Sequence, residues 1–288
     1  MDFVGFSLWF AALPEEAKKS MVLPASETIG RGLNGIVSAF ANPFIKLGMI
    51  SEHNLKNYET KLYAKTAEIP EINRDDSKQG LAIQALEDSL YRMEEEELLK
   101  AYTELITATL DNRKNQKVHP SFSTILRQMS SDDAVLFKKI LKSSALTFTP
   151  YIPLCTIESR ILPDNGVGII YKDTLVIPSP SGFTIETDTV SLSSLERLGL
   201  VRISRSSRLT GSIRMMKIHD NNGNGSLDII GTYDEAYNTL LNTDYYKEQF
   251  ELQKNHPEFA NPEMIRGSIE VTDLAKNLGN IINPNVLK

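Results

Sequence analysis

The sequence is poor in the residues that form disulfides and metal sites. Its single cysteine, Cys155, excludes an internal disulfide, and its apolar neighbours predict an inert buried thiol. The four histidines are His53, His119, His219 and His256. None of them stands at metal-ligand spacing from another histidine or from the cysteine. We therefore expect no cofactor and no bound metal, and the lone cysteine fits a reducing cytoplasm.

Long apolar runs and an excess of basic charge are missing as well. The apolar segment at residues 3–13 is shorter than the roughly 20 residues that a transmembrane helix needs. A signal peptide begins with basic residues, but no lysine or arginine precedes this segment. With 31 basic and 37 acidic residues the net charge is −6, so the overall field does not favour nucleic acid or anionic lipid. These features predict a cytoplasmic protein without a transmembrane helix.

Two amphipathic segments between residues 119 and 141 separate two differently patterned parts of the chain. Apolar side chains recur there at spacings of three and four, which is the pattern of one helical face. Ser121 stands where a helix N-cap is expected. Asp132 and Asp133 stand at the start of a second helix, where negative charge is favourable. We expect helices before this stretch, and strands mixed with helices after it.

The part before residue 119 has helical periodicity, including one long helix expected over residues 80–110. Gly30, Gly32 and Gly35 match the G-x-G-x-x-G pattern of dinucleotide-binding sites. They lie within a helical apolar stripe and not after a strand, so we favour close helix packing over a cofactor site. The glutamates at residues 94–97 fan around a helix, which predicts a solvated face rather than a metal site.

The part after residue 143 contains short apolar runs separated by prolines, which predict strands. Residues 191–203 predict a short helix that ends at Gly199 and leads directly into a strand. Further strands are expected at residues 211–218 and 227–230. This order resembles the winged-helix pattern, in which the last helix leads into the wing hairpin.

These patterns predict an α+β fold. We expect an N-terminal helical domain followed by a winged-helix-like C-terminal domain with inserted strands. The expected limits are residues 1–25 for an N-terminal arm, 26–117 for the helical domain and 118–288 for the winged-helix-like domain.

One stretch of the chain is basic and contains no acidic residue. Its basic residues are Arg197, Arg202, Arg205, Arg208, Arg214 and Lys217. In a winged helix they would lie at the end of the recognition helix and in the wing, where phosphate contacts are made. The stretch therefore predicts either a nucleic-acid surface or a protein-binding or solvated wing, and we prefer the second in an acidic protein. Replacing Arg205 and Arg208 with glutamate is expected to leave folding intact.

A short segment after this stretch resembles the calcium-binding loop of EF-hands. Its candidate oxygen ligands are Asp220, Asn222, Asn224 and Asp228. The twelfth position, which should supply a bidentate glutamate, is Gly231, so we expect at best a weak site. An Asn-Gly hairpin turn explains the same residues.

No motif identifies a catalytic centre. His119 and Ser121 are close in sequence, but no third group and no strained elbow completes a nucleophilic site. The sequence leaves enzymatic activity uncertain and favours a protein without one.

Three stretches resemble the abortive-infection alpha family, a bacterial and prophage-associated domain. They are the Lys-Leu-Gly-Met-Ile stretch at residues 46–50, the Glu-Glu-Glu-Leu-Leu stretch at residues 95–99, and a His-Pro-Ser-Phe motif. The motif, at His119, Pro120, Ser121 and Phe122, is the most specific part, and we expect it to be structural. The resemblance implies a role in defence against phage, and it implies no catalytic residues.

The predicted function is therefore that of a phage-defence protein that binds a protein or nucleic-acid partner without catalysing a reaction. The first alternative is a winged-helix DNA-binding transcription regulator. The second is a membrane-active effector that uses the apolar segments at residues 3–10 and 29–47. Self-association is left open by the sequence.

Overall fold

The computed structural model describes residues 37, 41, 45, 48, 50–161, 168–206, 209–218, 225–255 and 259–284. The predicted N-terminal arm and the glycine pattern at residues 30–35 lie outside the described residues. The chain divides into two compact units. Unit 1 comprises Met1–Ser131 with Asn280–Pro284, and unit 2 comprises Asp132–Gly279 with Asn285–Lys288. The domain limits expected at residues 25 and 117 stay predictions.

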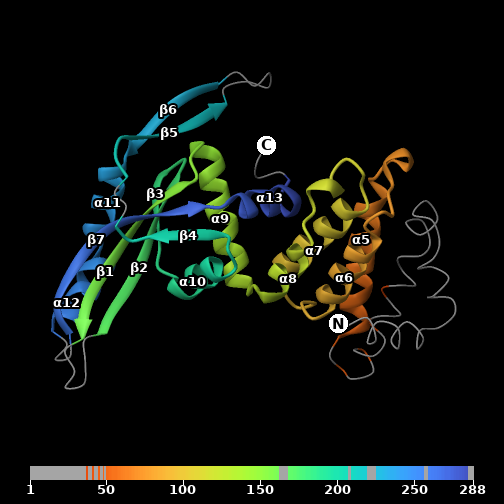
Figure 1. The fold of residues 1–288 in the computed structure, drawn as a ribbon, viewed down its shortest axis with the longest axis horizontal. Helices are drawn as coiled ribbons and strands as arrows, with labels where there is room; N and C mark the ends of the chain where they lie inside the picture. The colour runs from red at the N-terminus through yellow and green to blue at the C-terminus, as the bar shows by residue number, and fades with distance from the viewer. Residues whose placement is uncertain are drawn as a thin grey trace. The chain divides into compact units, whose positions relative to one another are not determined.

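Unit 1 is built from helices (Figure 1), and their buried apolar side chains form its core. Its described elements are α5 (Glu52–Ala67), η2 (Glu71–Asn73), α6 (Gln79–Leu90), α7 (Glu96–Thr109), η3 (Asn115–Lys117) and α8 (Ser121–Gln128). α7 packs on α5 and α6, and α8 packs on α6 and α7. Its largest fully buried side chains include Tyr58, Leu62, Leu86, Leu90, Leu98, Tyr102, Leu105, Ile106 and Phe122. Each buried leucine contributes roughly 1.5–3 kcal/mol relative to an exposed one.

The single helix expected over residues 80–110 is wrong, because two helices occupy this stretch. α6 ends at Leu90 and α7 begins at Glu96. The Arg92 guanidinium spans the turn between them, with Nη1 2.7 Å from Oε1 of Glu95. No proline or glycine marks this turn, so the apolar periodicity runs through it without interruption. Folding back allows the apolar faces of both helices to be buried against each other.

Unit 2 contains an antiparallel sheet in the order β3-β2-β1-β7-β4 and a separate hairpin of β5 and β6 (Figure 1). Its strands are β1 (Tyr151–Ile161), β2 (Gly168–Ser179), β3 (Gly182–Glu186), β4 (Val201–Ser204), β5 (Ser212–Ile218), β6 (Gly225–Thr232) and β7 (Phe259–Val271). The remaining helices are α9 (Ser131–Thr147), α10 (Thr189–Arg197), α11 (Tyr233–Leu241), α12 (Asp244–Lys254) and α13 (Asp273–Ile282). α8 and α9 confirm the two helices expected between residues 119 and 141.

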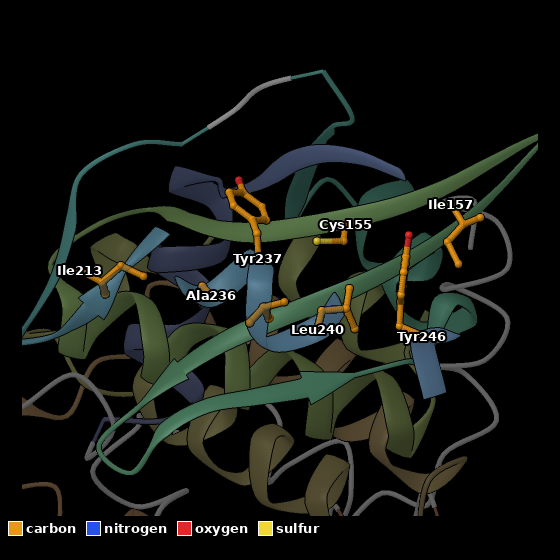
Figure 2. Close-up of a cluster of buried hydrophobic side chains, with 8 residues drawn as sticks. Cys155, Ile157, Ile213, Ala236, Tyr237, Leu240 and Tyr246 are labelled. Atoms are coloured by element: carbon orange, nitrogen blue, oxygen red, sulfur yellow. The ribbon is translucent and has the colours of Figure 1, made fainter. Parts of the chain in front are cut away.

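Alternate residues of β1 point to opposite faces of the sheet. Cys155 and Ile157 face α11 and α12, as Figure 2 shows. The buried cluster there consists of Cys155, Ile157, Val176, Ile213, Ala236, Tyr237, Leu240 and Tyr246. On the opposite face α9 is attached to β2, since Ser143 Oγ donates a hydrogen bond to the Pro178 carbonyl at 2.8 Å. The sheet therefore has helices on both faces (Figure 1).

The α+β class is confirmed, whereas the winged-helix arrangement is not. α10 leads through Gly199 directly into β4, as expected. β4 then pairs with β7, from Val201 opposite Val271 to Ser204 opposite Ser268, and β5 pairs with β6. The expected wing hairpin of the strand after α10 with the strand that follows it is therefore not formed. The helix-to-strand order is a local property of the sequence, but the partner of a strand is chosen by contacts between distant segments.

Candidate functional site

The corner of unit 2 where α10 meets β4 has an open pocket of about 460 Å³. The pocket is lined by Glu196, Gly199, Val201, Arg202, Ile203, Glu270, Thr272, Asp273 and Leu274. These residues come from the end of α10, from β4, from the end of β7 and from the start of α13. We call this set of residues the β4 corner.

α10 brings Glu196 to this corner. Its start is capped by Asp188, whose Oδ1 accepts hydrogen bonds from the amides of Val190 and Ser191 at 3.1 and 3.0 Å. A side-chain hydrogen bond from Ser191 lowers the pKa of Asp188, so the cap is anionic at neutral pH. A negative charge at this end of a helix is also favoured by the helix dipole.

The end of α10 is closed by a Schellman motif. Gly199 has φ of 73°, and the Leu200 amide donates to the Leu195 carbonyl at 3.0 Å. Thr272 then ties this turn to α13: its Oγ1 donates to the Gly199 carbonyl at 2.8 Å and accepts from the Ala275 amide at 3.1 Å. The walls of the pocket are therefore held by backbone hydrogen bonds and caps, not by mobile side chains alone.

β4 is the last strand of the described sheet on this side. The Ile203 amide donates to Oε1 of Glu196 at 3.2 Å, and so it points away from β7. In an antiparallel ladder successive residues alternate between the two sides of a strand. Val201 and Ile203 therefore direct their backbone groups toward the outer edge, while Arg202 and Ser204 face β7. The Glu196 carboxylate covers part of that edge.

The charged side chains of the β4 corner are mainly acidic. Glu196, Glu270 and Asp273 are opposed by Arg202 within the pocket lining. Arg202 Nη1 lies 3.5 Å from Oε2 of Glu270, and the Arg202 side chain is 75% exposed. An ion pair this exposed contributes only about 0–1 kcal/mol, so both side chains can exchange it for another partner.

Arg205, one of the predicted binding residues, is engaged within unit 2. Its Nε and Nη2 lie 3.1 and 2.6 Å from Oδ1 and Oδ2 of Asp173. Asp173 also accepts a hydrogen bond from Thr156 Oγ1 at 2.7 Å, and the Arg205 guanidinium lies 4.7 Å from the centroid of the Tyr171 ring. The hydrogen bonds to Asp173 raise the pKa of Arg205. This cation is a structural partner of a buried carboxylate.

The other predicted basic residues are distributed over several elements. Arg197 is the last residue of α10, and Arg214 is an exposed residue of β5. Lys217 also lies on β5, and Arg208 lies outside the described residues. Because Arg202 and Arg205 contact carboxylates, two members of the basic stretch are already paired within this unit.

The His-Pro-Ser-Phe motif forms the start of α8 in unit 1. Pro120, and not Ser121 as expected, occupies the N-cap position. His119 Nδ1 accepts from the Ser121 amide at 3.2 Å and lies 2.7 Å from Ser121 Oγ. The imidazole ring lies 5.9 Å from the ring of Phe122, which is buried. The motif thus supplies a cap and a core anchor for this helix.

A buried polar cluster in unit 1 was not found from the sequence. Asp88 on α6 accepts hydrogen bonds from Ser123 Oγ at 2.6 Å and from Arg127 Nη1 at 3.3 Å, both on α8. Arg92 donates to the Arg127 carbonyl. These residues stand on amphipathic helices among many other polar ones, and no spacing distinguishes them. Asp173, Glu196 and Glu270 were missed for a similar reason, because only the fold brings them to their partners.

The described part of the chain contains no group of three or more His, Cys, Asp or Glu residues placed to hold a metal ion. Asp228 lies on β6, where it accepts from Ser226 Oγ at 2.6 Å. Asp220, Asn222 and Asn224 lie outside the described residues, so the weak calcium loop stays a prediction. No described helix is both long enough and apolar enough to cross a membrane.

Comparison with known proteins gives one result. The family model described as "Abortive infection alpha" matches residues 50–282, which extend over most of the chain and include the β4 corner and the His-Pro-Ser-Phe motif. No curated protein and no solved structure matches the chain.

Proposed function

Since the chain belongs to the abortive infection alpha family, we propose that it acts in phage defence by binding a partner at the β4 corner, without catalysing a reaction. The observation that carries this proposal is the pocket of about 460 Å³ beside the outer edge of β4. Family membership supports the defence role, and the open pocket with its charged lining supports partner binding.

The chemistry of the described residues supports binding rather than catalysis. Burial raises the pKa of the Cys155 thiol to about 12, so it carries little thiolate at neutral pH. Asp88 and Asp173, two deeply buried carboxylates, accept hydrogen bonds from arginines and hydroxyls that connect secondary-structure elements. The β4 corner, in contrast, presents exposed charged side chains beside an open pocket, and such side chains take part in recognition at protein surfaces.

The alternatives predict different partners. A winged-helix regulator would bind duplex DNA with a strong dependence on salt, and a gel shift on genomic fragments tests this. A membrane-active effector would float with liposomes, and would lose this property when residues 1–50 are removed. Partner binding at the β4 corner requires neither result.

A charge-neutralising variant of the corner tests the proposal. Glu270→Gln combined with Asp273→Asn removes two exposed charges of the pocket with little change in volume. The matched control, Glu248→Gln with Glu251→Gln, removes the same charge from exposed positions on α12. Both variants and the wild-type chain are expressed in a phage-sensitive bacterium, and plaquing efficiency and growth are measured.

We expect the wild-type chain and the α12 control to lower plaquing efficiency. We expect the corner variant to lose about tenfold or more of this protection, because an effect on binding of about tenfold is what the loss of ~1.4 kcal/mol of contacts produces. Equal protection by the corner variant and the control would overturn the corner as the working surface. Absence of protection by the wild-type chain across a broad panel of phages would overturn the defence role.

A further inference from the structure

Unit 1 contains a pocket of its own, which lies in the groove between α5 and α7. Its volume is about 320 Å³, at the lower end of the range of about 300–1,000 Å³ that small-molecule sites occupy. The lining positions recur at spacings of three and four residues along each helix, from Tyr58 to Glu68 and from Glu96 to Glu104. Each helix therefore contributes one face to the pocket. Because α5 and α7 pack on each other, the pocket is part of the fold of this unit.

The floor of this pocket holds a buried hydroxyl group that lacks a hydrogen bond. Tyr58 and Thr103 are the two buried residues of the lining, and Tyr58 is only 2% exposed. Among the residues that the structure describes, none forms a hydrogen bond with Tyr58 Oη. The neighbouring hydroxyls of Ser89 and Thr103 are already used, since they donate to the carbonyls of Leu86 at 2.6 Å and Leu99 at 2.8 Å.

This hydroxyl is not explained by the packing of the core. Leaving a buried polar group without a partner is unfavourable, and a phenylalanine would fill the same space without that penalty. Burial raises the pKa of Tyr58, and the hydroxyls of Ser89 and Thr103 oppose the rise only in part. The phenol therefore keeps its proton at neutral pH. An acceptor atom that enters from the pocket would complete the missing hydrogen bond.

The rim of the pocket is charged, but its charges compensate one another. It carries three lysines and three glutamates, which are Lys61, Lys65, Lys100, Glu68, Glu96 and Glu104. Lys65 Nζ lies 3.0 Å from Glu104 Oε1 and 3.3 Å from Glu68 Oε2. Glu96 Oε1 lies 3.3 Å from Lys100 Nζ and 3.8 Å from Lys61 Nζ. A charged ligand gains no net attraction from this balanced rim, and moving its charge out of water is unfavourable.

The walls between the floor and the rim are apolar. They consist of Ala64 on α5, Leu99 on α7 and the alkyl stems of the lysines. We propose that this pocket binds a small, uncharged and mainly apolar molecule with a hydrogen-bond acceptor such as a carbonyl oxygen, to which Tyr58 donates its hydroxyl proton. This site goes beyond the proposed function, because its lining shares no residue with the β4 corner.

A direct binding experiment on the purified full chain tests this site. The probe is benzophenone, an uncharged molecule with two apolar rings and one carbonyl group. Diphenylmethane replaces the carbonyl with a methylene group, and para-benzoylbenzoate adds a negative charge. The affinity of each compound is measured by saturation-transfer NMR titration. We expect para-benzoylbenzoate to bind about tenfold or more weakly than benzophenone.

Tyr58→Phe isolates the hydrogen bond, because it keeps the ring and removes only the hydroxyl. We expect this variant to bind benzophenone about tenfold more weakly and diphenylmethane as the wild type does. Its unfolding temperature should equal or exceed that of the wild type, since an unpaired buried hydroxyl is lost. A merely structural role of the hydroxyl would instead lower the unfolding temperature and weaken both compounds alike.

Ala64→Leu tests the location of the site. It fills the pocket from an exposed position of α5, so the core is not disturbed. Ala67→Leu, at an exposed position of the same helix outside the lining, is the matched control. We expect Ala64→Leu to weaken benzophenone binding about tenfold or more and Ala67→Leu to bind like the wild type.

Three results would overturn the inference. Equal affinity of the wild type and Tyr58→Phe for benzophenone would remove the hydrogen bond, and equal affinity of the two leucine variants would remove the location. Absence of benzophenone binding up to its solubility limit, or tighter binding of para-benzoylbenzoate, would exclude an uncharged ligand of this kind. None of these results bears on the β4 corner, whose test is phage protection.

Discussion

The Arg205 guanidinium donates two hydrogen bonds to the Asp173 carboxylate, with Nη2 2.6 Å from Oδ2 and Nε 3.1 Å from Oδ1. Arg205 follows β4 and Asp173 lies on β2, and β1 and β7 lie between these two strands, so this pair joins parts of the sheet that share no ladder. The Asp173 side chain is only 8% exposed. Its charge therefore depends on this partner for compensation.

Arg205→Glu is expected to lower the free energy of unfolding by about 3–5 kcal/mol, because it leaves a buried carboxylate facing a second negative charge. This reverses the expectation from the sequence that folding would stay intact. Arg214→Glu, at an exposed position of β5, should change the free energy of unfolding by less than about 0.5 kcal/mol. Urea unfolding followed by circular dichroism measures both. Equal stability of the two variants would show that the ion pair is not needed for folding.

Gly267→Ala is expected to destabilise the chain by about 1–3 kcal/mol, because the segment after β4 passes directly over this glycine. An added Cβ would lie 2.9 Å from the Cα of Arg205, where backbone must shift. Gly80→Ala, in α6, has no neighbouring atom within 4 Å and should stabilise by about 0.4–1 kcal/mol. In thermal unfolding we therefore expect Gly267→Ala to lower the unfolding temperature and Gly80→Ala to raise it. An unchanged unfolding temperature for Gly267→Ala would contradict the close approach of backbone to Gly267.

Asp88→Ala is expected to cost about 1–3 kcal/mol, since Ser123 Oγ is left without its buried acceptor. Asp88→Asn keeps an acceptor oxygen for Ser123 and removes only the charge that attracts Arg127, so it should cost less. Chemical unfolding measures the free energy of unfolding of both variants, and we expect the larger loss for Asp88→Ala. If Asp88→Asn were the more harmful change, the hydrogen bond from Ser123 would not account for the contribution of Asp88 to stability.

Stability should fall above pH 9 in part because of Cys155. Burial raises the pKa of its thiol from 9.0 to about 12, so the unfolded chain releases this proton first as pH rises. The folded state then binds more protons than the unfolded state, and each such proton lowers the unfolding free energy by about 1.4 kcal/mol per pH unit. Cys155→Ala should reduce this slope in urea unfolding between pH 9 and 10. An unchanged slope would assign the effect to the buried tyrosines instead.

Local features of this chain were readable from its sequence. The spacing of apolar residues between positions 121 and 141 predicted α8 and α9, and the Leu-Gly-Leu pattern predicted the end of α10 and the start of β4. The α+β class and the resemblance to the family followed from such patterns as well. These features depend on residues that are close together in the sequence, so local patterns predict them.

The partners of these elements were decided only by the tertiary structure. The turn around Arg92 has no breaker residue and exists because α6 and α7 bury their apolar faces on each other. β4 pairs with β7, some seventy positions further along the chain, and Arg205 forms an ion pair with Asp173 across the sheet. Strand pairing and buried ion pairs arise from contacts between distant segments. Their free energies depend on how deeply the groups are buried, which a local sequence pattern does not predict.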